Sequence, residues 1–276
     1  MELPFNASKP RQSCNAHHLK ELMTSFFIWS NYFFSCFSFD MITFNPAYNI
    51  NFKHFKHEIL DRSGHVISRG DTCLFRNDLD FDYLVNFLEY KYRDSDKVNI
   101  IAHACSDGEE IFSFISKMID SLGYKNSKKY LPVDARDVNK SFIEIAKKGQ
   151  YSLKSYETGA IDFYLGENLT QYFSFLNPNL VKVSKILKEC VNFSQSDILD
   201  DVKSIDFNNT VLFARNFWHY LDDEDIDKLA MILSHRMNKT STLIIGDFDK
   251  QYNIDRILRR YGFYETKVSN VFELYK

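Results

Sequence analysis

One glycine loop decides the fold of this chain, the stretch Ala102-His103-Ala104-Cys105-Ser106-Asp107-Gly108-Glu109-Glu110. An apolar run at residues 98–101 precedes it, and a helical pattern that extends to Leu122 follows it. A buried strand that turns through a glycine into a helix is how an open α/β sheet presents a ligand at its carboxyl edge. The sequence therefore predicts an α/β fold with a binding loop at residues 102–110.

The residues of this loop select the kind of ligand. A phosphate-binding loop usually carries several glycines because a pyrophosphate must approach the backbone, whereas this loop has only Gly108, followed by Glu109 and Glu110. Carboxylates here repel a phosphate and suit a positive amino group, so S-adenosylmethionine fits better than NAD or ATP. The alternative is an ordinary helix N-terminus, where the macrodipole favours acids.

The composition of the chain further narrows the possible classes of protein. A chain of 276 residues is long enough for one large α/β domain and a smaller one. The net charge is -3, which gives no global bias toward nucleic acid or anionic membrane. The five cysteines form no CxxC pair, a pattern typical of reduced thiols in a cytoplasmic protein.

The N-terminal part of the chain offers two features with ordinary explanations. The aromatic stretch 26–39 is too short and too polar to span a bilayer; we expect a packed helix there, with a partner-binding surface as the alternative. His54 and His57 have a spacing that suits one helix face and a metal. Because no matching Cys or His pair lies nearby and lysines flank both, we expect a solvated face and no metal site.

From about residue 97 the chain alternates strand-like and helix-like segments. The expected strands are 97–103, 129–134, 190–196, 210–214 and 241–247, with a closing hairpin at 263–268 and 270–275. The expected helices are 109–122, 138–148, 222–238 and 253–261. This alternation predicts a mostly parallel sheet with crossover helices. A parallel sheet that ends in an antiparallel strand is typical of class I methyltransferases.

Several segments, taken in order, resemble the chemotaxis-receptor methyltransferases, the CheR family. Residues 72–78 resemble its Thr-x-Phe-Phe-Arg-Asp/Glu motif, and residues 105–110 resemble Cys-Ser-Thr-Gly-Glu-Glu. Residues 135–139 with 146–151 are similar to Ala-Thr-Asp-Ile-Asp and Ala-Arg-x-Gly-x-Tyr, and residues 213–220 to Phe-Cys-Arg-Asn-Val-x-x-Tyr. Weaker similarities at 169–173 and 191–198 keep the family order.

The resemblance implies both an architecture and a cofactor. It implies a class I methyltransferase domain at residues 71–276, Rossmann-like with a mostly parallel seven-stranded sheet, after an N-terminal helical segment at residues 1–70. It leaves room for a small β-subdomain near 151–185. The implied cofactor is S-adenosylmethionine, with S-adenosylhomocysteine as the product.

The resemblance also assigns roles in the cofactor site. Glu109 accepts from the methionyl ammonium, while Glu110 either caps the helix or contacts the ligand. Asp137 takes both ribose hydroxyls, with Asp134 as its rival. Asp197, in the family's Asn position, accepts from the adenine amino group beside the Ile198 backbone. The full implied set is Ala104, Ser106, Gly108, Glu109, Asp137, Asp197, Ile198 and Asn216.

Arg76 suggests the methyl acceptor. A guanidinium holds a carboxylate by two parallel hydrogen bonds, and the family's acceptor is a glutamate on a receptor. Such a carboxylate is already ionised at neutral pH, so the transfer needs no general base. Thr72 and Tyr220 orient Arg76 and the attacking oxygen. The alternative for Arg76 is a surface salt bridge with Asp78 or Asp80.

Some positions depart from the family pattern and keep other functions open. Gly70 stands where the family has Asn, and residues 246–249 read Gly-Asp-Phe-Asp in place of Gly-His-Ser-Glu. The leading prediction is a carboxylate O-methyltransferase that acts on a protein. The alternatives are a small-molecule or peptide O- or N-methyltransferase and a non-catalytic S-adenosylmethionine-binding protein. The expected partner is an acceptor protein, peptide or small carboxylic acid, with no nucleic acid and no membrane insertion.

Overall fold

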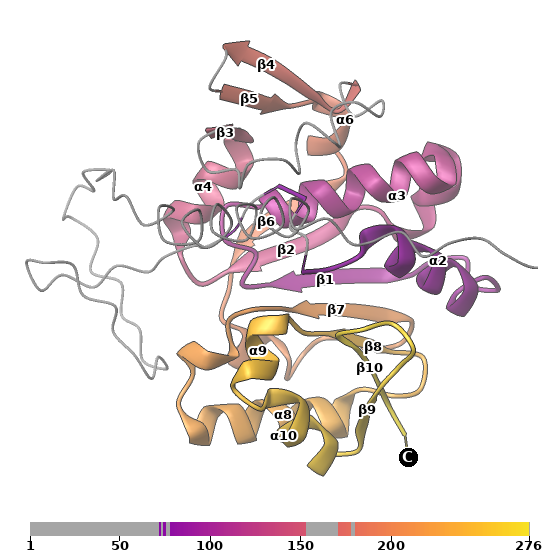
Figure 1. The fold of residues 1–276 in the computed structure, drawn as a ribbon, viewed down its shortest axis with the longest axis vertical. Coiled ribbons are helices and arrows are strands. Elements are labelled where there is room, and N and C mark those ends of the chain that lie inside the picture. Colours follow the sequence, from indigo (N-terminus) through magenta and orange to yellow (C-terminus); the bar gives the residue numbers. More distant parts are fainter. Residues whose placement is uncertain (1–71, 73, 76–77, 153–170, 178–179, 276) are drawn as a thin grey trace, which may run out of the picture. The chain divides into compact units, whose positions relative to one another are not determined.

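The computed structural model describes residues 72, 74–75, 78–152, 171–177 and 180–275. Its central sheet has seven strands in the order β6-β2-β1-β7-β8-β10-β9 (Figure 1). They are β1 (Asn99–His103), β2 (Val133–Asp137), β6 (Val191–Gln195), β7 (Thr210–Ala214), β8 (Thr242–Ile244), β9 (Phe263–Glu265) and β10 (Val271–Leu274). The first five run parallel, whereas β10 is antiparallel to both of its neighbours. The predicted α/β class and the closing hairpin are confirmed.

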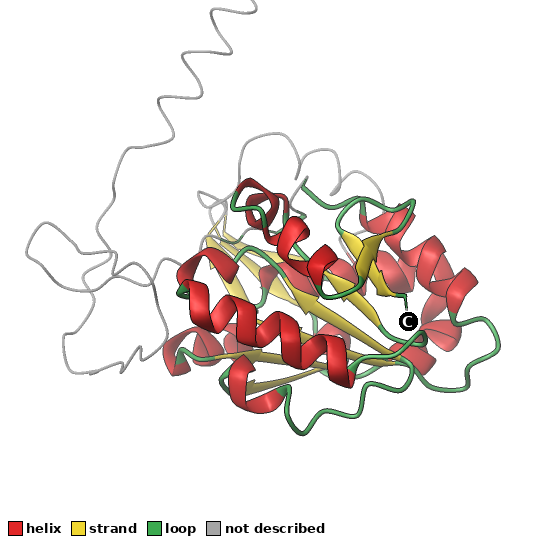
Figure 2. Cartoon of the chain, turned by 90° about the horizontal axis from the view of Figure 1, so that it is seen from below, coloured by secondary structure: helices red, strands yellow, loops and turns green. Residues whose placement is uncertain are grey.

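Helices pack on both faces of this sheet (Figure 2). The longer helices are α2 (Phe81–Lys91), α3 (Glu109–Ser127), α4 (Lys140–Lys148), α8 (Asp223–Arg236) and α10 (Ile254–Arg260). The short ones are η1 (Lys128–Tyr130), α6 (Lys185–Lys188), α7 (Ile198–Asp201), η4 (Trp218–Tyr220) and α9 (Asp247–Gln251).

Alternate residues of the central strands belong to two separate hydrophobic cores, because successive side chains of a strand point to opposite faces of the sheet. Ile100 and Phe213 belong to the core beneath α2 and α3, whereas Ile101 and Leu212 belong to the core beneath α8 and α10. Strands buried on both faces read as continuous apolar runs, which is why residues 98–102 and 210–214 were recognisable in the sequence.

The second strand begins later than predicted. We expected residues 129–134, but β2 spans Val133–Asp137 because Lys128–Tyr130 form a 3-10 turn that extends the end of α3. Tyr130 is buried in that turn, and its hydroxyl donates to Glu89 Oε2 across 3.0 Å. The shift makes Asp137 the last residue of β2, at the carboxyl edge of the sheet.

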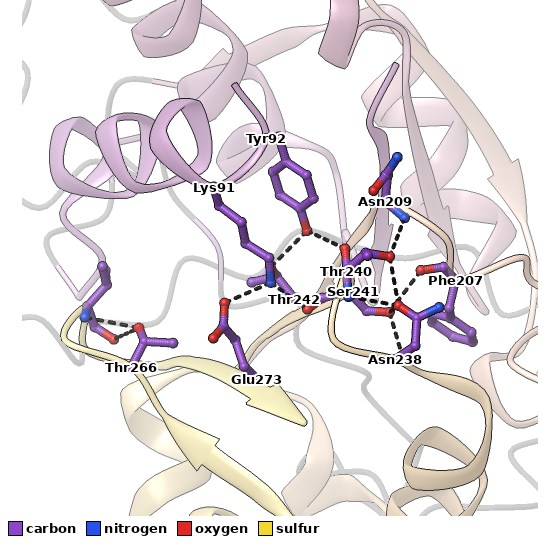
Figure 3. Close-up of polar contacts among 11 residues, drawn as sticks. Lys91, Tyr92, Phe207, Asn209, Asn238, Thr240, Ser241, Thr242, Thr266 and Glu273 are labelled. Atoms are coloured by element: carbon purple, nitrogen blue, oxygen red, sulfur yellow. Dashed lines mark hydrogen bonds and ion pairs between the residues drawn. The ribbon is translucent and has the colours of Figure 1, made fainter. Parts of the chain in front are cut away.

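Helix α2 was not predicted from the sequence. Its N-cap is Asp80, whose side chain accepts from Tyr83 N, and its apolar face buries Phe81, Leu84, Val85 and Leu88. Polar contacts bind the C-terminal end of α2 to the amino edge of the central sheet (Figure 3). There Lys91 Nζ lies 2.7 Å from Glu273 Oε1 and 2.8 Å from Ser241 O, and Tyr92 donates to Thr240 O across 3.0 Å. This polar network lies opposite the edge that carries the glycine loop.

A second, three-stranded antiparallel sheet comprises β3 (Gln150–Ser152), β4 (Phe173–Asn177) and β5 (Leu180–Val183), in the order β3-β5-β4. The Tyr151 hydroxyl donates to Asp107 O across 2.7 Å, which ties this sheet to the glycine loop. The proposed segment 1–70, the aromatic stretch 26–39, His54 and His57 lie outside the described residues. Within the described part of the chain, no helix is long and apolar enough to cross a membrane.

Candidate functional site

The loop after β1 has a strained backbone that needs small or specially placed residues. Ala104, Ser106 and Gly108 have positive φ angles of 54°, 50° and 86°. A Cβ atom on Gly108 would lie 2.8 Å from the Phe193 ring, so the turn requires glycine there. Strain of this kind persists where the surrounding structure holds it and is common at ligand sites.

Asp137 joins this loop to the end of β2. Its Oδ2 accepts from Ser106 N and its Oδ1 from Asn139 N, each across 2.8 Å. Burial raises the pKa of Asp137, and the two N–H donors oppose that shift. Asp134, the rival ribose acid, lies at the second position of the strand and accepts from Asn192 Nδ2. Of the two carboxylates, the structure therefore brings Asp137 to the glycine loop.

The loop also holds buried polar atoms that suit a ligand. Ser106 Oγ and Asp107 Oδ1 are buried and have no hydrogen-bond partner among the described residues. Burial raises the pKa of Asp107 to about 6, with a further contribution from Asp137. Glu109 is the first residue of α3 and is buried as well. Carboxylates gathered beside an unsatisfied hydroxyl fit a cofactor that carries an ammonium and a sulfonium.

The predicted adenine residues lie at the end of the neighbouring strand. β6 pairs with β2, and Ser196 N donates to Asp137 O across 3.0 Å. Asp197 then caps α7, with its Oδ1 accepting from Leu199 N across 2.9 Å, and Ile198 is buried. The structure thus brings Asp197 and Ile198 close to Asp137, although one carboxylate oxygen of Asp197 already serves as a helix cap.

Arg215 belongs to the motif at residues 213–220, which predicts no role for its side chain. Its buried guanidinium contacts Glu110 Oε2 at 2.5 Å and Asp78 Oδ2 at 3.1 Å. Glu110 therefore forms an ion pair, and the N-cap of α3 is Gly108, which has no capping side chain. The available signals were its place in the motif at residues 213–220 and its position directly after the apolar strand 210–214.

Asn216 has its side-chain atoms engaged within the protein. Its Nδ2 donates to Asp78 Oδ2 across 3.1 Å, and its Oδ1 accepts from Phe248 N across 3.3 Å. Buried Asp249 accepts from the N–H groups of Asn216 and Gly246 across 2.6 and 2.8 Å. Burial raises the pKa of Asp249 to about 7, although these N–H groups favour its ionised form. Cofactor contact by Asn216 stays a prediction, and the contacts seen are those of a scaffold.

The acceptor-side residues are only partly described. Thr72 is half-buried, and Arg76 lies outside the described residues, so its distance to Tyr220 stays a prediction. Next to Arg76, Phe75 N donates to Ser113 Oγ across 2.8 Å, and the Phe75 ring packs edge-on against Phe173. Tyr220 lies in η4, where its ring centroid is 3.9 Å from that of His219.

Strand order defines the class of protein. Five parallel strands, an antiparallel β10 inserted between β8 and β9, and a glycine loop after β1 make this a class I methyltransferase fold. The family model described as CheR methyltransferase, SAM binding domain, matches residues 70–260, and the chain belongs to that family. The matched part is the S-adenosylmethionine-binding domain of the CheR methyltransferases, so the cofactor is S-adenosylmethionine.

Curated relatives support this family at low identity. A chemotaxis protein methyltransferase of Borreliella burgdorferi is 25% identical over 197 residues, which cover 68% of this chain and 66% of that protein. One from Campylobacter jejuni is 25% identical over 223 residues, covering 78% and 77%. The matched part of the chain thus spans slightly less than two thirds of the Borreliella protein.

Solved structures give weaker likenesses. The methyltransferase domain of bacterial CtHen1-C is 11% identical, with a TM-score of 0.37, and the match covers 71% of this chain and all of that one. A TehB-like SAM-dependent methyltransferase from Corynebacterium glutamicum is 12% identical, with a TM-score of 0.35 over 71% and 86% of the two chains. At such scores the likeness adds nothing to the strand order.

Among the described residues, no group of three or more His, Cys, Asp or Glu could hold a metal ion.

Proposed function

We propose that this methyltransferase O-methylates a carboxylate, the side chain of a glutamate in an acceptor protein. The observation that carries the proposal is the anchoring of the chain on both sides of Arg76. Phe75 N is bound to Ser113 of α3, and Asp78 is bound to Arg215 after β7. Both anchors lie at the edge of the sheet that holds the glycine loop, which supports a role in acceptor binding for the segment between them.

The residues would act by alignment. The cofactor supplies a methyl group on a sulfonium, which is transferred in line to an oxygen nucleophile. Arg76 would hold the acceptor carboxylate by paired hydrogen bonds and fix the direction of its oxygen. That carboxylate is ionised at neutral pH, so no residue has to remove a proton. Tyr220 and Thr72 would orient the pair, and positioning of this kind contributes to the rate enhancement.

The names of the relatives support a chemoreceptor as the acceptor. The Borreliella and Campylobacter proteins are both named chemotaxis protein methyltransferases. At 25% identity that name supports the proposal without fixing the acceptor of this chain. We therefore assign it to chemotaxis as part of the same proposal.

A second candidate, methylation of a small molecule or peptide, is favoured by one local feature. His219 stacks on Tyr252 and packs edge-on against Phe248, at centroid distances of 5.1 and 4.8 Å. Phe248 and Tyr252 are 42% and 48% exposed. His219 follows β7, and Phe248 and Tyr252 follow β8, at the carboxyl edge of the sheet. Of the three, Phe248 lies in the segment 246–249, where the family has Gly-His-Ser-Glu. An exposed aromatic surface there suits an apolar acceptor group.

Release of methanol by base separates the two candidates. The purified chain is incubated with cofactor labelled in its methyl group and a membrane fraction containing the organism's own chemoreceptors. We expect protein-bound label that is released as volatile methanol in base, because methyl esters hydrolyse and N-methyl groups do not. The control omits the membrane fraction. Label that stays on protein in base, or that appears only on small molecules, contradicts the protein-carboxylate proposal.

A further inference from the structure

The Arg215 side chain binds three segments that are far apart in the sequence. Its Nη1 lies 2.5 Å from Glu110 Oε2 at the start of α3, and its Nη2 lies 3.1 Å from Asp78 Oδ2. Its Nε donates to Ile245 O across 3.3 Å, directly after β8. One guanidinium thus joins the cofactor loop, the end of β8 and the segment before α2.

Asp78 has further partners at the same edge. Its Oδ2 also accepts from Asn216 Nδ2 across 3.1 Å, and its backbone oxygen accepts from Asn270 Nδ2 across 3.4 Å. The Asp78 side chain is 18% exposed, so the contacts of its carboxylate are partly buried and charge-assisted. Residues directly after β7 and in the turn before β10 therefore determine where the chain lies just before α2.

Arg215 is too enclosed to contact a substrate. Its side chain is 2% exposed, and its nitrogens face the two carboxylates and the Ile245 carbonyl. Burial disfavours its charged form, but Glu110 and Asp78 outweigh that effect and raise the pKa of Arg215. The permanent charge has a fixed planar geometry, which suits a residue that holds other groups in register.

We propose that Arg215 and Asp78 are a positioning pair that sets the acceptor-side segment against the cofactor loop. Glu110 adjoins Glu109 of the cofactor site, and Asp78 lies two residues after Arg76 in the sequence. The pair thus links the segment that carries Arg76 to the glycine loop of the cofactor site. The expected effect of this pair on turnover rests on the proposed carboxylate methylation. The contacts of Arg215 and Asp78 do not depend on it.

Conservative variants test the pair without leaving a buried charge wholly unpaired. Asp78→Asn keeps the shape but removes the charge that faces Arg215. Arg215→Lys keeps a charge that can serve one carboxylate but loses the planar fork. Asp82→Asn is the matched control: Asp82 lies four residues further on, in α2, and pairs with Lys117. The readouts are S-adenosylhomocysteine affinity by calorimetry, hydrogen exchange of the Phe75 amide, melting temperature, and the rate of base-labile methylation.

For Asp78→Asn we expect turnover to fall by about 30-fold or more, the scale for losing substrate alignment. The affinity for S-adenosylhomocysteine should stay within about threefold of the parent, because the cofactor loop keeps Arg215 paired with Glu110. The Phe75 amide should exchange at least about tenfold faster, since its segment loses an anchor. Arg215→Lys should have a smaller effect on turnover, and Asp82→Asn should change none of these values.

Two outcomes overturn the proposal. One is an Asp78→Asn variant with parental exchange and parental turnover. The other is a parallel loss of cofactor affinity, melting temperature and turnover, which indicates a general structural role. If the parent protein itself fails to methylate a carboxylate, the proposed function is wrong, and the exchange and affinity measurements still decide whether Asp78 and Arg215 position this segment.

Discussion

The backbone N–H of Ser106 donates to the Asp137 carboxylate across 2.8 Å. This bond joins the strained loop after β1 to the last residue of β2. Asp137 therefore has two tasks at once: it fixes the loop, and it presents a buried carboxylate at the edge where the ribose of the cofactor is expected. A substitution at Asp137 should accordingly affect the binding site more than the overall stability of the fold, because Asp137 lies at the end of its strand.

We expect Asp137→Ala to weaken S-adenosylhomocysteine binding by about 1.5–3 kcal/mol, the scale for losing a charged hydrogen-bond partner. Asp134→Ala is the matched control, because this carboxylate is on the same strand but bonds to Asn192. Isothermal titration calorimetry gives both values. An Asp137→Ala variant with parental affinity, beside a weakened Asp134→Ala variant, would reverse the two assignments.

Cofactor binding should depend on pH through Asp107. Burial raises the pKa of Asp107 to about 6, so the folded free protein takes up a proton there as the pH falls. An ammonium ligand prefers the ionised carboxylate, so affinity should increase as the pH rises through 6 and level off above 7. At pH 5 about one tenth of the sites are ionised, which predicts roughly tenfold weaker binding than at pH 7.

The family residue provides the variant for this pH test. Asp107→Thr, which restores the Thr of the family loop, should bind S-adenosylhomocysteine with little change between pH 5 and 7. Titrations of both proteins over this range give the comparison. A parent whose affinity is flat over the range, or a variant with the same slope as the parent, would show that Asp107 does not face the ammonium.

Gly246 should tolerate no side chain. A Cβ atom there would lie 1.7 Å from Asn216 Oδ1, and Asn216 is held by Asp78 and Phe248. We expect Gly246→Ala to lower the free energy of unfolding by about 1–3 kcal/mol, the usual cost of overpacking, as measured by denaturant titration. In the double variant Gly246→Ala/Asn216→Gly the clash is absent, so the two effects should be clearly less than additive. Strict additivity would place the strain elsewhere.

The sequence predicted those features whose signals are local. The apolar runs that became β1 and β7, the glycine turn and the closing hairpin can each be recognised within about ten residues. The start of β2 was predicted too early because Tyr130, buried in a 3-10 turn, reads like a strand residue. The role of Arg215 could not be predicted, because its partners are residues 78, 110 and 245, which only the fold brings together.

The prediction that decides the acceptor concerns Arg76. If its guanidinium holds the acceptor carboxylate, Arg76→Ala should lower turnover by about 100-fold or more, the scale for losing substrate positioning, while S-adenosylhomocysteine affinity stays nearly intact. Arg76→Lys should recover only part of the loss, since an ammonium keeps the charge without the planar fork. Single-turnover rates with the labelled cofactor, beside calorimetric affinities, measure the two effects separately. Unchanged turnover in Arg76→Ala would exclude a carboxylate clamp at this position. The cofactor site around Asp137 would be unaffected by that result, and an apolar acceptor beside Phe248 and Tyr252 would become the leading interpretation.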